Sequence, residues 1–363
     1  MQPSFSQVKI TLDWKGLAAC IRRNGTPGRV FNMELLMDPE VKETLCTRFD
    51  LNTNLKPGDP DFEMKREIRV QRFLGYDYVR CSLDEFDVRL NHIFAEDTAP
   101  FRRDGGRKFI DEHKGPITNW EEFESYPWPD PDKVSTRKLE FYEANLPEDM
   151  CIIGSGQFAH FAEYLSWLMG YETLCYALFD QRDLVKAISE KLIQIYSRVI
   201  ERFLAFDRVK IIWGSDDMGF RSATLLSPAD LREFVLPGHR LMAEKTHRAG
   251  RPYLLHSCGN LNAIIEDLID DIGIDAKHSF EDTIETVEDA KKRYGNRIAL
   301  LGGIDVDFLC RSDETSVRKR VRKTLDACFK GGGYCLGTGN SVANYIPLDN
   351  YLAMLDEGRK YVH

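Results

Sequence analysis

Tyr253-Leu254-Leu255-His256-Ser257-Cys258-Gly259-Asn260 is an apolar run that ends in a polar turn, a pattern typical of a strand. Side chains at positions i and i+2 of a strand lie on the same face, so His256 and Cys258 can point the same way while Ser257 points the other. The stretch therefore predicts a strand with two potential metal ligands on one face. What these ligands can do depends on the architecture around them.

The same pattern recurs along the chain. From about residue 150 onward, short apolar runs alternate with amphipathic stretches of helical length, which is typical of βα units. One helix is expected from Asp183 to Phe206, and Ser227-Pro228 marks the start of another. With two earlier candidates, the expected strands are residues 29–36, 76–83, 151–154, 209–214, 252–258, 274–278, 298–302 and 334–337. Eight parallel strands close an α/β barrel, so the sequence predicts a single TIM-type (β/α)8 barrel.

The segment from residue 91 to residue 150 does not follow this rhythm, because it is rich in proline, glycine and charge. Loops of this length are usually functional or disordered. We expect a long insertion after the second strand, lying over the barrel mouth, with a hairpin at Asp104 to Gly106.

Composition excludes several classes of protein. The formal net charge of −9 comes from interspersed acids and bases, which argues against a nucleic-acid-binding face. No run approaches the roughly 18 apolar residues of a membrane helix, and the N-terminal stretch has no signal-type apolar core. Nine cysteines in a chain of 363 residues suit free thiols better than a disulfide scaffold. We therefore expect a cytoplasmic protein with neither a nucleic-acid nor a membrane partner.

A third potential metal ligand is Cys335, in Gly333-Tyr334-Cys335-Leu336-Gly337. One imidazole and two thiolates suit a catalytic zinc that keeps a position open, and the carboxyl ends of barrel strands all face one mouth. A buried cysteine is commonly a small hydrophobe, however, and a lone histidine usually belongs to the hydrogen-bonded structure, so spacing alone leaves both interpretations open. The other cysteines are expected to be packing residues: Cys20, Cys46, Cys81, Cys151, Cys175, Cys310 and Cys328.

Three acids at strand ends are candidate catalytic residues. Asp216 and Asp217 follow an expected strand and could supply a fourth ligand, a proton acceptor or a hydrogen bond to a cofactor, with only one of them facing the cavity. The alternative for this pair is a solvated loop acid or a helix cap. Glu34 interrupts an apolar run, which favours an inward-facing site acid and a second candidate for the fourth ligand, although an outward, paired surface acid remains possible.

Further polar residues at the strand ends are candidates for binding a cofactor. Gln157 and His160 could line a pocket for a planar ligand, although ordinary core contacts are the simpler interpretation. His278 ends another expected strand. Asn340 lies in Leu336-Gly337-Thr338-Gly339-Asn340-Ser341, a glycine-rich turn that could either cradle a phosphate or allow a close approach of neighbouring backbone.

Several motifs together point to a family. They are Gly115-Pro116-Ile117, Trp128-Pro129-Asp130-Pro131, Gly214-Ser215-Asp216-Asp217, Ser227-Pro228, His256-Ser257-Cys258-Gly259-Asn260-Leu261, Gly273-Ile274-Asp275-Ala276, Gly302-Gly303-Ile304-Asp305, residues 331–342, Ile346-Pro347 and Asn350. With them the chain resembles the uroporphyrinogen decarboxylase superfamily, and within it the cobalamin-dependent methyltransferases that carry a zinc site. The resemblance covers most of the chain and implies one such barrel domain over residues 1–363, with His256, Cys258 and Cys335 holding zinc.

The resemblance also implies an activity. We expect transfer of a methyl group between a corrinoid, either methylcobalamin or a corrinoid protein, and a small thiol or tetrahydrofolate. Zinc would stabilise the thiolate of a thiol acceptor, and Asp217 or Glu34 would complete the metal coordination or take the proton. A corrinoid protein would dock at the barrel mouth under residues 91–150.

Two alternatives come from the same resemblance. Uroporphyrinogen decarboxylases carry an arginine-rich motif near the first strand, where this chain has Phe31-Asn32-Met33-Glu34-Leu35-Leu36. An acid at that place would repel a polycarboxylate, so tetrapyrrole decarboxylation is the lesser interpretation. It would have to use the clustered arginines Arg22, Arg23, Arg102, Arg103 and Arg107. A non-catalytic protein that binds a corrinoid or tetrapyrrole would need no zinc.

Overall fold

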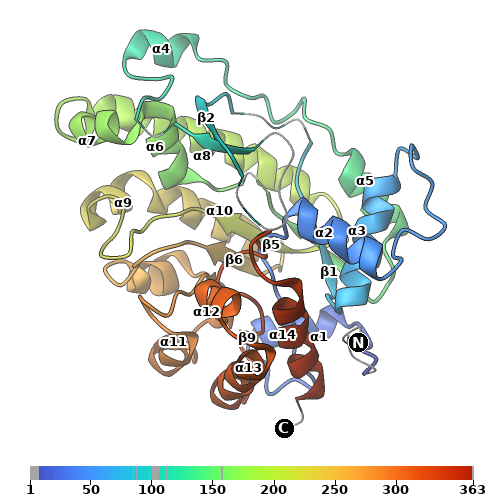
Figure 1. The fold of residues 1–363 in the computed structure, drawn as a ribbon. Coiled ribbons are helices and arrows are strands. Elements are labelled where there is room, and N and C mark those ends of the chain that lie inside the picture. The colour runs from blue at the N-terminus through green and yellow to red at the C-terminus, as the bar shows by residue number, and fades with distance from the viewer. Residues whose placement is uncertain are drawn as a thin grey trace.

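The centre of the molecule is a parallel sheet with helices around it (Figure 1). The computed structural model describes residues 8–84, 86, 88–97, 99, 106–111, 113–156 and 158–361. Its main sheet has seven strands in the order β1-β4-β5-β6-β7-β8-β9, and every neighbouring pair is parallel. These strands are β1 (Tyr78–Cys81), β4 (Cys151–Gly154), β5 (Val209–Ser215), β6 (Tyr253–His256), β7 (Ala276–His278), β8 (Ala299–Leu301) and β9 (Tyr334–Cys335).

Helices separate these strands along the chain, which confirms the predicted α/β class. In chain order they are α1 (Trp14–Ile21), α2 (Pro39–Arg48), α3 (Phe62–Leu74), α4 (Trp120–Ser125), α5 (Arg137–Asn145), α6 (Phe161–Met169), α7 (Tyr171–Asp180), α8 (Arg182–Leu204), α9 (Pro228–Phe234), α10 (Leu236–Arg248), the π-helix η1 (Asp267–Ile272), α11 (Val287–Tyr294), α12 (Val306–Arg311), α13 (Glu314–Cys328) and α14 (Leu348–Lys360). None of the described helices is long and apolar enough to cross a bilayer.

Local sequence explains where two of the expected helices begin and what they bury. The apolar positions of α8, among them Leu184, Ile188 and Ile195, are buried at helical spacing. Helix α9 begins after Ser227, whose Oγ accepts a hydrogen bond from the Asp230 backbone N at 3.1 Å. Both features agree with the sequence prediction.

The expected first strand, residues 29–36, is not a strand of the sheet, so the predicted count of eight strands is wrong by one. The segment lies beside β9, where Met33 N donates to Leu336 O and Leu336 N donates to Phe31 O, each at 2.8 Å. Its link to β1 is a side chain: the Tyr78 hydroxyl accepts from Glu34 N at 2.8 Å. We call the boundary between residues 31–37 and β1 the seam. The sheet curls so that the same segment contacts its first and last strands.

The chain between β1 and β4 carries its own small elements. A hairpin of β2 (His92–Ala95) and antiparallel β3 (Arg107–Ile110) is followed by α4 and α5. Asp104 and Gly105, in the expected hairpin turn, fall outside the described residues. Asn344 Nδ2 donates to Asp97 Oδ2 at 3.0 Å, which ties the segment after β2 to the loop after β9.

The seam generates a stability prediction. Replacing Tyr78→Phe leaves the buried Glu34 N–H without an acceptor, and an unsatisfied buried donor costs about 1–3 kcal/mol. We expect the free energy of unfolding, measured by urea denaturation, to fall by that amount. Tyr176→Phe is the matched control, because Tyr176 is 65 % exposed and its hydroxyl should contribute nothing measurable. Equal stability of the two variants would mean that this hydroxyl does not hold the seam.

Candidate functional site

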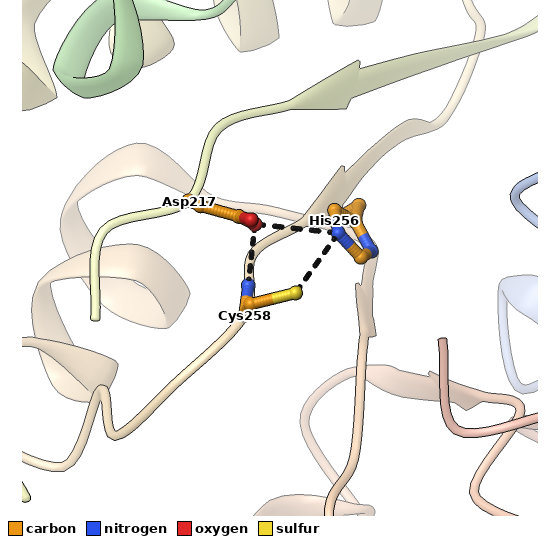
Figure 2. Close-up of side chains that lie close together, drawn as sticks. All are labelled: Asp217, His256 and Cys258. Carbon is orange, nitrogen blue, oxygen red and sulfur yellow. Dashed lines mark hydrogen bonds and ion pairs between the residues drawn. The ribbon is translucent and has the colours of Figure 1, made fainter. Parts of the chain in front are cut away.

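Asp217, His256 and Cys258 lie together at the carboxyl ends of β5 and β6 (Figure 2). His256 Nε2 is 3.3 Å from Asp217 Oδ1 and 3.4 Å from Cys258 Sγ. The potential ligand atoms of the three side chains all lie within 4.8 Å of one another. In the part of the chain that the structure describes, no other cluster of three or more His, Cys, Asp or Glu side chains has this geometry. We call these three residues the trio.

The register of the parallel strands explains the cluster. Ser215, the last residue of β5, pairs with His256, the last residue of β6, so the loops that follow begin side by side. The loops also contact each other closely: Gly259 has φ +85°, and a Cβ there would lie 2.1 Å from the Gly219 carbonyl oxygen. The Cys258 backbone N donates to Asp217 Oδ1 at 2.8 Å, which fixes the acid beside the thiol.

His278 orients the imidazole of His256. The Nδ1 atoms of the two rings are 2.7 Å apart, and both residues are buried. Burial lowers the pKa of His278 well below its ordinary value, so this ring is neutral and its Nδ1 can accept a hydrogen bond. His256 then keeps its Nδ1–H toward His278 and directs Nε2 toward Asp217 and Cys258. His278, expected to bind a cofactor, therefore lies behind the trio.

In the absence of a metal, the trio holds a proton on His256. Burial alone would lower the pKa of His256, but the Cys258 sulfur and the Asp217 carboxylate beside it outweigh burial and raise it to about 10. Burial would likewise raise the pKa of Asp217, yet its hydrogen bond to His256 and the backbone N–H of Cys258 bring it below the ordinary value. A site that holds a proton this tightly is suited to a divalent cation.

Cys335 does not join the trio, which corrects the expected third ligand. It lies within β9, paired with Leu301, and its thiol faces Cys20 of α1. The hydrogen bond with Cys20 and burial raise the pKa of the Cys335 thiol well above its ordinary value, and its sulfur is not among the ligand atoms that lie within 4.8 Å of one another. The residue beside Cys258 is Asn340, whose Nδ2 donates to the Cys258 Sγ at 3.2 Å.

Asp216 is also corrected, from a candidate catalytic residue to a helix cap. Its carboxylate accepts hydrogen bonds from Ala162 N at 2.9 Å and Glu163 N at 3.0 Å, at the start of α6. The same carboxylate accepts from His239 Nε2 at 2.9 Å, and neither side chain is exposed. Of the two adjacent acids, Asp217 alone faces the trio.

Glu34 is buried as expected for an inward-facing acid, but it belongs to a different contact. Thr338 binds both of its oxygens, through N to Oε1 at 2.8 Å and through Oγ1 to Oε2 at 2.6 Å. Burial, opposed by these hydrogen bonds, raises the pKa of Glu34 to about 8, so the carboxyl is largely protonated at neutral pH. Glu34 therefore lies at the seam and outside the trio.

Two cavities meet beside the sheet. One, of about 300 Å³, is lined by Glu34 and Arg80; the other, of about 510 Å³, is lined by Arg80, His160 and Ser215. His160 pairs through Nδ1 with Glu163 and lies 3.3 Å from the Gly156 carbonyl oxygen through Nε2. Its expected cofactor-binding role stays a prediction, and Gln157 lies outside the described residues.

Arg80 lines both cavities and was not singled out from the sequence. It lies inside the expected strand 76–83 and is the third residue of β1. Its Nε donates to Ser155 Oγ at 3.0 Å across the cavity wall. A charged residue within an otherwise apolar strand was the available signal, the same signal that singled out Glu34.

The position of Asp216 predicts a structural defect. Asp216→Ala leaves the buried His239 and two N–H groups of α6 without their acceptor, and loss of a buried charged partner costs roughly 3–5 kcal/mol. Thermal and urea unfolding should show this loss. The control Asp349→Ala removes a surface pair with Arg48 and should change stability by less than about 1 kcal/mol. A stable Asp216→Ala protein would contradict the capping role.

The pKa of Glu34 predicts a pH dependence of stability. Because this pKa is raised from 4.5 to about 8 in the folded protein, its stabilising effect is complete below the unfolded value and is lost as pH rises through the folded value. Relative to Glu34→Gln, the metal-free wild type should lose about 1.4 kcal/mol per pH unit between those limits. Urea denaturation of both proteins at pH 5 and pH 8.5 measures the difference. A constant difference would show that Glu34 is ionised in both states.

Residues 115–361 match the family model described as Uroporphyrinogen decarboxylase (URO-D). Among curated proteins, a methylated-thiol–coenzyme M methyltransferase of Methanosarcina mazei is 34 % identical over 133 residues, which are 36 % of this chain and 33 % of that protein. A uroporphyrinogen decarboxylase of Cupriavidus necator is 31 % identical over 104 residues, 28 % of this chain and 26 % of that protein. These matches span about a third or less of each relative's length.

A solved structure described as a methyltransferase from Methanosarcina mazei resembles nearly the whole fold. Its TM-score is 0.65 at 18 % sequence identity, with 95 % of this chain and 97 % of that chain covered. At this identity the likeness concerns the fold alone. The family match, in contrast, takes in well over half of the sequence, including every residue of the trio. The protein belongs to the uroporphyrinogen decarboxylase family.

Proposed function

We propose that this chain is a zinc-dependent methyltransferase that moves a methyl group between a corrinoid and a small thiol or tetrahydrofolate. The trio of Asp217, His256 and Cys258 would hold the metal. The observation that carries the proposal is the convergence of a carboxylate, an imidazole and a thiol from two adjacent strand ends. Cys335, given its contact with Cys20, is not part of the proposed ligand set.

The geometry of the trio suits zinc. Ligands at about 2.0–2.3 Å from a tetrahedral ion lie roughly 3.3–3.8 Å from one another. His256 Nε2 is 3.3 Å from the Asp217 oxygen and 3.4 Å from the Cys258 sulfur, at the short end of that range. Three protein ligands leave a fourth position for substrate, as in catalytic zinc sites. The Asp217 side chain is 40 % exposed and that of His256 is 4 % exposed, so the solvent side of the trio is the side of the acid.

A zinc ion bound there would stabilise the thiolate form of a thiol substrate at neutral pH. The chain's own residues prepare the site. His278 fixes the direction of His256, the Cys258 backbone N–H holds Asp217, and Asn340 Nδ2 donates to the Cys258 sulfur. Such hydrogen bonds behind the ligands orient them and tune their charge.

The comparisons support the reaction class. A methylcobamide:CoM methyltransferase MtaA of Methanosarcina barkeri is 26 % identical over 140 residues, 39 % of each chain. With the methylated-thiol enzyme of Methanosarcina mazei, its name favours a corrinoid as methyl carrier and a thiol as acceptor for this chain as well. We propose a corrinoid protein as partner and a cytoplasmic location. We also propose that residues 1–363 form one barrel domain whose segment 91–150 lies over the mouth.

Tetrapyrrole decarboxylation remains the second candidate, because uroporphyrinogen decarboxylases are among the matched relatives. Of the arginines that this reaction would use, Arg22 donates to Gly250 O, next to the C-terminal end of α10, and so points away from the trio. Zinc content distinguishes the proposed methyltransferase from a decarboxylase. It also distinguishes the methyltransferase from a non-catalytic binding protein, which needs no zinc.

The decisive measurement is zinc content after purification without added metal. We expect about one zinc per chain in the wild type and loss of zinc in Cys258→Ala and His256→Ala, because each removes a ligand of the trio. Cys335→Ala is the matched control: it also removes a thiol from a strand end, yet it should keep its zinc.

Elemental analysis and circular dichroism of all four proteins give the result. Methyl transfer from methylcobalamin to a thiol, followed by the cobalamin spectrum, should then fail in Cys258→Ala and survive in Cys335→Ala. A folded wild type that takes up no zinc under reducing conditions would overturn the proposal. Loss of zinc from Cys335→Ala as well as from the His256 and Cys258 variants would restore the ligand set expected from the sequence.

A further inference from the structure

We propose that Arg80 binds the anionic group of the substrate, a carboxylate, sulfonate or phosphate, in the two cavities that its side chain lines. The inference rests on the proposed function only in treating the ligand as a substrate. Arg80 would be a binding residue that makes the cavities selective for a negatively charged ligand.

The first observation is where the guanidinium lies. Arg80 belongs to β1, and it lines both the 300 Å³ cavity and the 510 Å³ cavity. Its Nε donates to Ser155 Oγ, and its guanidinium carbon lies 5.5 Å from the centre of the Trp213 ring. These contacts hold the planar group in one position and leave its remaining N–H donors for the cavity.

The second observation is that Arg80 has no ion-pair partner among the described residues, whereas the acids lining the two cavities are already engaged. Thr338 binds both oxygens of Glu34. The remaining acids are paired as follows: Glu63 with Arg66, Glu67 with Lys42 and Gln71, and Asp84 with Lys138. The lining lysines, Lys42 and Lys138, are thereby neutralised as well. In the described part of the chain, Arg80 is thus a permanently charged group at these cavities with no acid in ion-pair contact; the nearby Glu67 carboxylate is paired with Lys42.

An unpaired charge in such a position is costly, and the fold retains it. Burial lowers the pKa of Arg80 to about 10, so the group still carries its charge at neutral pH. Taking an ion out of water costs several kcal/mol unless a counter-ion and hydrogen bonds offset it. A bound anion supplies both, and the fork of guanidinium donors matches the geometry of carboxylate, sulfonate and phosphate oxygens.

A chain of contacts links Arg80 to the trio. The Trp213 ring beneath Arg80 packs edge-on against His278 at 5.6 Å, and His278 is the residue that orients His256. The indole Nε1–H of Trp213 is buried without a hydrogen-bond partner, so a second unmatched donor lies in the same neighbourhood. Ser215, which lines the larger cavity, is the register partner of His256. A ligand held by its anionic end at Arg80 is therefore adjacent to the strand ends that carry the trio.

Anion binding can be measured without any methyl transfer. Sodium acetate, methanesulfonate and phosphate would be titrated separately by isothermal calorimetry, with sodium chloride keeping the ionic strength constant. The proteins are wild type, Arg80→Met, Arg80→Lys and the control Arg248→Met, whose exposed arginine contacts the side chain and the backbone carbonyl of Glu244 on the same helix. The three anions distinguish which oxyanion the site prefers.

We expect one anion site per wild-type chain and roughly tenfold or greater weakening in Arg80→Met, as loss of a charge-assisted hydrogen bond predicts. Arg80→Lys should bind with intermediate affinity, because it keeps the charge and loses the fork. Arg248→Met should bind like the wild type. Should Arg80→Met not fold by circular dichroism, the Lys variant decides, since unchanged affinity there contradicts recognition by the fork.

Anion binding in Cys258→Ala separates this inference from the metal site. If the zinc-free variant still binds the anion and Arg80→Met does not, Arg80 is the binding residue whatever the metal does. If Arg80→Met binds as the wild type does, or if no anion binds to the wild type, the inference is overturned while the zinc result stands. Binding that disappears only with Cys258→Ala would place the anion on the metal and also overturn it.

Discussion

The register of β5 against β6 is the constraint on which the site depends. Ser215 pairs with His256, so the two strands end at the same level and their loops start side by side. Parallel strands buried on both faces cannot slip without losing their backbone hydrogen bonds. The close approach of Gly259 to Gly219 then fixes the two loops against each other. Asp217 and Cys258 are adjacent because the strand register and the contact between the two loops place them there.

Two neighbouring acids with opposite roles show how the fold distributes charge. Asp216 turns into the core, where two N–H groups at the start of α6 and His239 satisfy it completely. Asp217 turns to the other side, where its partners are His256 and the Cys258 backbone N–H. A fully satisfied carboxylate anchors structure, whereas a partly exposed one beside an imidazole and a thiol is available to a cation.

Much of the architecture could be predicted from the sequence, because buried parallel strands and amphipathic helices have clear periods. The end of β7 at His278, the cap at Ser227 and the approach of His256 to Cys258 follow from local pattern, whereas β6 ends two residues before the expected Cys258. The segment 29–36 could not be assigned, because its backbone pairs on one side only. Alternation showed that one of two adjacent acids faces the cavity, but which one depends on where β5 ends.

The sequence also could not show that Asn340, and not Cys335, lies beside Cys258. Cys335 has the expected residue type, but it lies within β9 and contacts Cys20, whereas Asn340 lies further along the loop, beside Cys258. How far a loop runs before it reaches the site is a property of the tertiary fold. Arg80 was missed for a related reason: its role depends on which neighbouring acids already have partners, and those pairs join residues far apart in sequence.

The seam has a consequence for how a ligand enters. Between residues 31–37 and β1 a tyrosine hydroxyl replaces a ladder of backbone hydrogen bonds, and the 300 Å³ cavity is lined from both sides of that boundary. This cavity thus lies where a side-chain hydrogen bond, and not a ladder of backbone hydrogen bonds, joins the two segments. A molecule that entered between these two segments would separate few main-chain hydrogen bonds and would leave the pairing of β5 with β6, which carries the trio, intact.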